Sequence, residues 1–142
     1  LDQLRKLLRI AEKSGIHQEE WPFQLAAVEV TGDLARAFPR ILPDPKAPAA
    51  VRRGYTVFVQ NCLPCHTLNR QGESRMGPDL NVPMNITEYW RPEAIRALVR
   101  DPDKVRHWPE GKMTTFSKDQ LPEADLDDLL IYLQHMAGRK AE

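Results

Sequence analysis

The sequence predicts an all-α fold, and three segments with helical periodicity carry this prediction. Residues 49–60, 92–100 and 122–137 each place apolar side chains three and four positions apart, which gathers them on one face of a helix. Pro92 suits a first helical turn, and acidic residues follow Pro122, where the helix dipole favours negative charge. We therefore expect three main helices joined by loops, one of them a long loop.

An N-terminal arm, residues 1–48, precedes this helical domain, which covers residues 49–142. Leucines at helical spacing predict a short helix at the start of the arm. Four prolines between Pro39 and Pro48 predict an extended connector, because proline fixes φ and lacks a backbone donor. The arm has no recognisable catalytic grouping, so we expect it to pack on the helical domain or to dock on a partner.

Composition excludes several classes of protein. The chain has 142 residues, with 20 Lys+Arg against 20 Asp+Glu, and this zero net charge argues against a nucleic-acid binder. The longest uncharged stretch, residues 54–69, contains polar side chains, so we expect no transmembrane segment. The sequence does not open with a basic head and an apolar run, and we expect that a signal peptide has been removed.

The motif that carries chemistry is Cys62-Leu63-Pro64-Cys65-His66. Cys-x-x-Cys-His is the attachment signature of c-type haem. Residues three and four apart share a helical face, so both thiols can form thioethers with one porphyrin while His66 faces the iron. The motif thus predicts one haem c, attached through Cys62 and Cys65 and ligated by His66.

Three other interpretations of the two cysteines stay open at this point. A thioredoxin-like redox motif would follow a strand of a βαβ unit, whereas the surroundings here are helical. Half of a zinc site would need two further ligands, and His107 and His135 lack the paired spacing. A plain disulfide is the third interpretation.

Residues 49–137 resemble the class I c-type cytochromes. Gly54 and Phe58 match the first helix of that family, which crosses its last helix, and Tyr132-Leu133 matches the aromatic-Leu pair of that last helix. Gly77-Pro78-Asp79-Leu80 matches the Gly-Pro-x-Leu segment. The resemblance implies a class I cytochrome c fold of three to five helices around one covalent haem. It also implies that the Pro78 carbonyl accepts a hydrogen bond from the proximal imidazole.

The resemblance places the sixth iron ligand on a loop before the last helix. Met113 lies there in Met-Thr-Thr-Phe, where the family has a sequence like Met-Pro-x-Phe. We expect His66 and Met113 to be the two metal ligands, with Met84 and His107 as alternatives. Of the remaining methionines and histidines, Met76 is expected beside the proximal turn and Met136 in the core. His17 and His135 are expected at the surface.

Further cofactor-binding residues follow from the same resemblance. Leu80 and Phe116 are expected to pack on the haem, along with Val57, Leu68 and Leu98. Arg100 and Trp108 are expected to donate hydrogen bonds to the propionates, although Trp108 serves equally well as a core residue. Trp90 is expected in the core.

The predicted function is electron transfer by a monohaem cytochrome, which is an electron carrier or the electron-transfer subunit of an oxidoreductase. Two protein ligands on the iron suit a change of oxidation state and leave no position for substrate. The alternative is a haem enzyme or a gas or redox sensor with a displaceable distal ligand. Arg70 and Arg75, which follow the motif, are expected either to rim the partner contact or simply to be solvated.

Partners and location follow from the resemblance as well. The expected partners are an electron-donor enzyme and an acceptor cytochrome or oxidase. The segments 21–25 and 85–90 weakly resemble cytochrome subunits of molybdenum sulfite-oxidase-type systems, which favours a molybdenum-dependent donor. Because haem attachment is completed outside the cytoplasm, the resemblance implies a periplasmic location.

Overall fold

The computed structural model describes residues 35–107, 109–111 and 113–141. Phe38–Glu142 form one compact unit. The short helix predicted at the start of the arm, His17 and the segment 21–25 lie outside the described residues. The elements in the described ranges are helices, with no strand among them, so the predicted all-α class is confirmed there.

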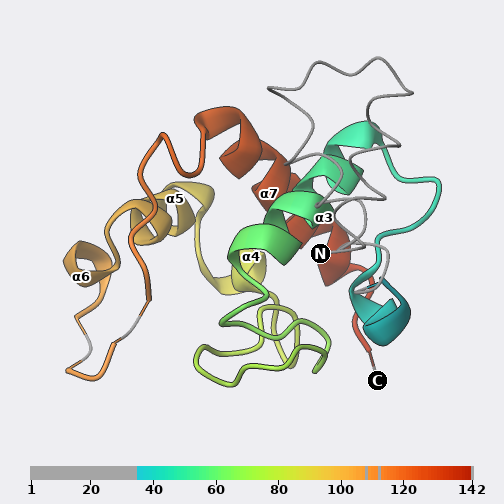
Figure 1. Ribbon diagram of the computed structural model, residues 1–142, viewed down its shortest axis with the longest axis horizontal. Coiled ribbons are helices and arrows are strands. Elements are labelled where there is room, and N and C mark those ends of the chain that lie inside the picture. Colours follow the sequence, from blue (N-terminus) through green and yellow to red (C-terminus); the bar gives the residue numbers. More distant parts are fainter. Residues whose placement is uncertain (1–34, 108, 112, 142) are drawn as a thin grey trace, which may run out of the picture. The chain divides into compact units, whose positions relative to one another are not determined.

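Three main helices form where the apolar periodicity predicts them (Figure 1). They are α3 (Ala49–Asn61), α5 (Pro92–Arg100) and α7 (Glu123–Ala137). Pro122 occupies the N-cap position of α7, and Glu123 and Asp125 follow in the first turn, where the helix dipole stabilises negative charge. Gly138 caps the other end of α7.

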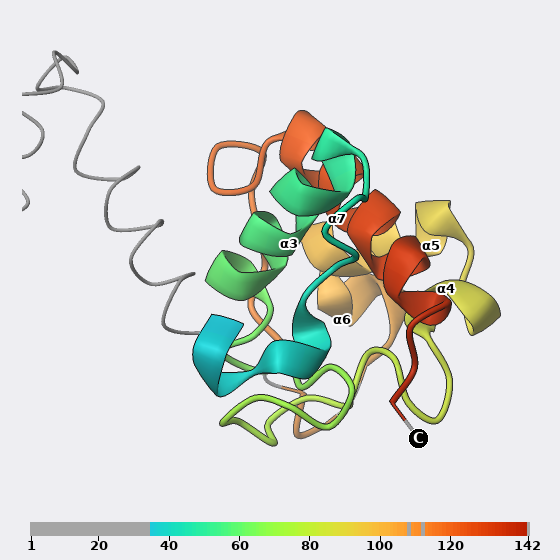
Figure 2. The same cartoon turned by 90° about the vertical axis from the view of Figure 1, so that its right-hand side faces the viewer.

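Helices α3 and α7 pack closely against each other (Figure 2). A Cβ atom added at Gly54 would lie 1.9 Å from the Asp128 carbonyl oxygen, so only glycine allows the backbones to come this close. Next to the crossing, the rings of Phe58 and Tyr132 pack with their centroids 5.4 Å apart. This crossing of the first and last helices is the arrangement expected from the resemblance.

Residues 38–48 pack within the same unit as the helices, although we predicted them as part of the arm. Pro39–Ile41 form a 3-10 helix, η1, in place of an extended chain. Ile41 is fully buried, and its carbonyl oxygen accepts a 2.6 Å hydrogen bond from the Tyr132 hydroxyl. The backbone N–H of Asp44 donates to His135 Nε2 at 3.1 Å. These contacts with α7 tie the connector to the helical core.

Two short helices lie in regions that we predicted as loops or helix ends. Helix α4 (Ile86–Tyr89) interrupts the long loop, residues 67–91, and packs on α7 (Figure 2). Asn85 and Glu88 form a reciprocal capping box at its start. Helix α6 (Pro102–Val105) follows α5 directly. Throughout the described ranges, the helices lack the combined length and apolar character that crossing a bilayer requires.

Candidate functional site

The Cys-x-x-Cys-His motif forms a turn at the end of α3. The N–H of Cys62 closes the helix by donating to the Phe58 carbonyl at 2.8 Å. The Cys62 carbonyl in turn accepts from the N–H groups of Cys65 at 3.1 Å and His66 at 2.8 Å. The backbone therefore keeps turning through the motif, which brings the two cysteines and the histidine to one place as the spacing predicts.

Cys62 and Cys65 are not joined in a disulfide, and both are half-buried. Burial, together with the neighbouring Cys65, raises the pKa of the Cys62 thiol to about 12. A redox-active cysteine of the thioredoxin type has a lowered pKa and reacts as a thiolate. The environment of Cys62 has the opposite effect, and the motif follows helix α3 instead of a strand, so both observations disfavour the thioredoxin-like interpretation.

The imidazole of His66 is held by a backbone carbonyl. Its Nδ1 lies 2.8 Å from the Pro78 oxygen, which is the contact expected from the resemblance. Gly77 lies against the ring, and a Cβ added there would fall 2.4 Å from His66 Cε1. With Nδ1–H donated to the carbonyl, Nε2 carries the lone pair that a metal ligand needs.

The segment that supplies this carbonyl runs beside the motif and is bonded to it on both sides of His66. The N–H of Gly77 donates to the Cys65 carbonyl at 2.8 Å. The N–H of Leu80 donates to the Thr67 carbonyl at 3.0 Å. Pro78 is thus fixed between two backbone hydrogen bonds, and the His66 ring lies between them.

Met113 lies on the connection between α6 and α7, and its side chain is 36% exposed. Its neighbour Lys112 is outside the described residues, as is Trp108, whose predicted role has no structural description. Further along, the N–H of Phe116 donates to the Val99 carbonyl at 3.0 Å. This bond fixes the connection to α5 just after Met113.

Arg100 clamps the same connection. Its Nη1 donates to the carbonyl oxygens of Phe116 at 3.2 Å, Ser117 at 3.0 Å and Leu121 at 2.7 Å. Its Nη2 donates to Glu123 at 2.8 Å, at the start of α7. We did not expect this role from the sequence, because backbone carbonyls in a loop leave no sequence pattern. The predicted contact of Arg100 with a haem propionate stays a prediction.

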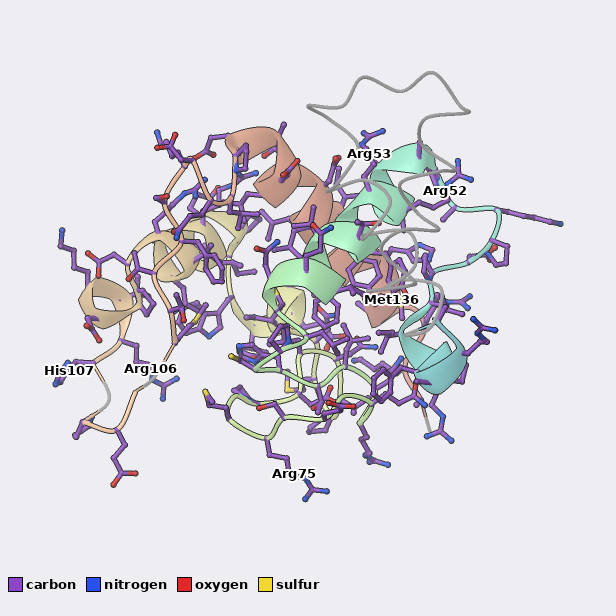
Figure 3. All side chains as sticks on the ribbon, in the orientation of Figure 1. Arg52, Arg53, Arg75, Arg106, His107 and Met136 are labelled. Carbon is purple, nitrogen blue, oxygen red and sulfur yellow. The ribbon has the colours of Figure 1, made fainter. Side chains whose placement is uncertain are left out.

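The other candidate ligands differ in their surroundings. Met136 is fully buried on α7 among the packed helices (Figure 3), as expected for a core residue. His135 Nε2 already accepts the Asp44 N–H. Met84 is 52% exposed and Met76 is 62% exposed. His107 is exposed on the connection that follows α6 (Figure 3).

The predicted haem-packing residues fall into two groups. Val57, Leu68 and Leu80 are buried, with at most 7% of their surface exposed. Leu98 and Phe116 are half-buried, as is Trp90, which we expected in the core.

In the part of the chain that the structure describes, His, Cys, Asp and Glu side chains form no cluster of three or more that could hold a metal ion.

A polar cluster beside Pro78 escaped the sequence analysis. The carboxylate of Asp79 accepts four hydrogen bonds from its surroundings, and three asparagines nearby are almost completely buried. The only signal in the sequence is the density of asparagine in the loop, at positions 69, 81 and 85. Asparagine is common in exposed turns, so this signal does not by itself predict burial.

Comparison with known proteins agrees with this geometry. Residues 51–137 match the protein family described as cytochrome c. The chain belongs to the cytochrome c family. The cytochrome is also similar to the Cbb3-type cytochrome c oxidase subunit CcoP of Azospirillum brasilense, with 29% identity over 92 residues. That alignment covers 65% of the cytochrome and 30% of the relative. No solved structure matches significantly.

Family membership implies covalently bound haem c, and the site fits this group. Cys62 and Cys65 have the spacing of the attachment motif. The absence of a Cβ at Gly77 leaves room for the His66 ring, whose Nδ1 is already engaged by Pro78. The donor set therefore suits a proximal histidine of a class I cytochrome c, an all-α fold that transfers electrons.

Proposed function

We propose that this cytochrome is a monohaem electron carrier whose iron is ligated by His66 and Met113. The observation that carries the proposal is the fixed imidazole: His66 donates to Pro78 at 2.8 Å and packs on Gly77. An imidazole held in this way keeps one orientation and is a stronger ligand. Arg100 and the bond between Phe116 and Val99 hold the connection that carries Met113, which supports Met113 as the second ligand.

A haem c held by Cys62, Cys65, His66 and Met113 would supply a one-electron couple, and the methionine ligand would raise its potential. The chain's own residues keep that couple in place. Pro78 orients His66, and Arg100 holds the connection after Met113 to α5 and α7. If His66 and Met113 both bound the iron, the haem would have no position left for a substrate. This arrangement favours electron transfer over the alternative of a haem enzyme or sensor.

We also propose that two apolar residues bind the cofactor. Leu80 and Phe116 pack on the haem, with Leu80 positioned by its bond to Thr67 and Phe116 by its bond to Val99. Apolar contact of this kind lowers the local dielectric and helps to set the potential. The roles of Arg100 and Trp108 as donors to the propionates stay predictions, and Trp108 lies outside the described residues.

The cytochrome exchanges electrons with redox protein partners in the periplasm. The chain spans about a third of the length of the oxidase subunit that it resembles, and the name of that relative supports an acceptor of the oxidase type. A molybdenum-dependent donor stays a prediction. Arg75 projects from the loop that follows the motif (Figure 3), which supports a role for this residue at the rim of the partner contact.

Absorption spectroscopy of three variants tests the ligands. We expect the ferric cytochrome to be low-spin, with a thioether-to-iron charge-transfer band that is lost in Met113→Ala. Met84→Ala and His107→Ala are matched controls, because each removes a rival ligand from an exposed position. Loss of the band in Met84→Ala alone would reassign the ligand. A high-spin ferric spectrum of the unaltered protein would support the enzyme or sensor instead.

A further inference from the structure

Three buried asparagines form a continuous chain of side-chain hydrogen bonds. Asn85 Nδ2 donates to Asn81 Oδ1 at 2.8 Å, and Asn81 Nδ2 donates to Asn69 Oδ1 at 2.8 Å. All three side chains are at most 1% exposed. A buried amide without partners is costly, so such a chain persists only where its members satisfy one another. We call these three residues the amide ladder.

Each member of the amide ladder also donates to the C-terminal end of α7 or just beyond it. Asn85 Nδ2 donates to the Leu133 carbonyl, Asn81 Nδ2 to the Met136 carbonyl, and Asn69 Nδ2 to the Arg139 carbonyl, at 2.8, 2.8 and 2.9 Å. These acceptors are three positions apart and therefore lie along one side of the chain. The ladder thus fixes the loop between α3 and α4 to the end of α7.

The ladder continues into Asp79, the residue after Pro78. One carboxylate oxygen of Asp79 accepts the backbone N–H groups of Asn81 and Val82, both at 2.9 Å. The other accepts the Arg70 N–H at 2.7 Å and the Thr67 hydroxyl at 2.9 Å. This carboxylate therefore holds together the two segments that flank His66 and Pro78.

Two neighbouring residues of the loop adopt an unusual backbone conformation that these hydrogen bonds use. Asn69 has φ 53° and Arg70 has φ 62°, both in the left-handed region that non-glycine residues seldom adopt. Asparagine tolerates this region better than most residues. The N–H of Arg70 in this conformation reaches Asp79, and the side chain of Asn69 enters the ladder.

We propose that Asn69, Asn81 and Asn85, together with Asp79, are positioning residues that hold the Pro78 carbonyl against the His66 imidazole. A continuous set of bonds runs from the end of α7 through Asn81 and Asp79 to the peptide that carries this carbonyl. Helix α7 packs on α3 in the core, and these two helices have the most extensive contacts of any helix pair in the described unit. The ladder therefore ties the proximal loop to the well-packed core. The inference rests on the proposed function, in which His66 binds the iron.

The test follows the His66 ring proton in the reduced, haem-loaded protein by nuclear magnetic resonance. In Asn81→Ala we expect the Nδ1 proton to exchange with solvent at least about tenfold faster, since its hydrogen bond opens more often. We also expect the reduction potential to rise, because a weaker bond to Pro78 lowers the electron density on the imidazole. Asp79→Asn, which preserves side-chain shape, should show a smaller shift in the same direction.

Tyr132→Phe is the matched control. This substitution removes one buried hydrogen bond, from the Tyr132 hydroxyl to the Ile41 carbonyl. That hydroxyl does not bond to the ladder, so the ladder keeps all its hydrogen bonds. Faster exchange in Asn81→Ala or Asp79→Asn, but not in Tyr132→Phe, would support the positioning role. If the exchange rate of the Nδ1 proton and the reduction potential match those of the control in every variant that folds, the positioning role is overturned. The absorption spectrum of the unaltered protein tests the iron ligands separately.

Discussion

Gly77 and His66 are in contact, with no room for a side chain between them. A Cβ atom at Gly77 would lie 2.4 Å from Cε1, 2.6 Å from Nδ1 and 3.0 Å from Nε2 of the imidazole. The same segment bonds the ring through the Pro78 carbonyl. One short piece of backbone therefore sets both the plane of the ring and its tautomer.

Replacing Gly77 by alanine should displace the imidazole. The added methyl group cannot fit beside the ring, so we expect a destabilisation of about 1–3 kcal/mol and a shifted or heterogeneous absorption spectrum. Chemical denaturation and the ferric spectrum measure the two effects. Gly138→Ala is the control, since its Cβ would meet only ordinary contacts at 3.6 Å. Equal behaviour of the two variants would contradict the close contact.

Replacing Gly54 by alanine should separate α3 from α7. The new Cβ would lie 1.9 Å from the Asp128 oxygen and 2.6 Å from Tyr132 Cβ, so the helices must move apart. We expect a loss of about 3 kcal/mol in the free energy of unfolding, measured by urea denaturation. Gln60→Ala, at an exposed position of the same helix, should change it by less than about 0.5 kcal/mol. A small effect at Gly54 would refute the tight crossing.

Replacing Arg100 by glutamine should loosen the connection that carries Met113. Three backbone carbonyls and Glu123 lose a charged donor, for which we expect a cost of about 1.5–3 kcal/mol. We therefore expect the thioether band to disappear at a lower temperature than in the unaltered protein.

Arg96→Gln is the matched control for this experiment. Arg96 pairs only with the carboxylates of Glu123 and Asp127 among its described contacts, and such exposed pairs contribute about 0.2–1 kcal/mol. If both variants lose the band at the same temperature, the clamp at Arg100 has no particular effect on Met113.

Acid should weaken the loop around Asp79. Burial alone would raise the pKa of Asp79, but hydrogen bonds from Val82, Asn81, Arg70 and Thr67 outweigh it and lower the pKa below its ordinary value of 3.8. A carboxyl with a lowered pKa stabilises the fold above its unfolded value, and that contribution is lost as the pH falls through the folded-state value.

Urea denaturation at neutral pH and at about pH 3 measures this effect. We expect Asp79→Asn to be less stable than the unaltered protein at neutral pH, and the difference to shrink in acid because the protonated carboxyl resembles the amide. A difference that stays constant across this range would show that ionised Asp79 does not stabilise the loop.

The sequence predicted the long elements and missed the short ones. The helices at residues 49–60, 92–100 and 122–137 were predicted within one or two residues, because each is long enough to show an apolar stripe. Helices α4 and α6 have four residues each, and a single turn carries no periodicity. Asn85 and Glu88 have the spacing of a capping box, which was the available signal for α4.

The attachment motif and its family match were readable from the chain alone, because Cys62, Cys65 and His66 lie within five consecutive residues and their spacing is set by one helical turn. The tertiary structure decided how the imidazole is held. Asn81 reaches Met136 across 55 residues, and Asn69 reaches Arg139 across 70. Hydrogen bonds between such distant segments depend on how the helices pack, and local sequence spacing contains no record of that packing.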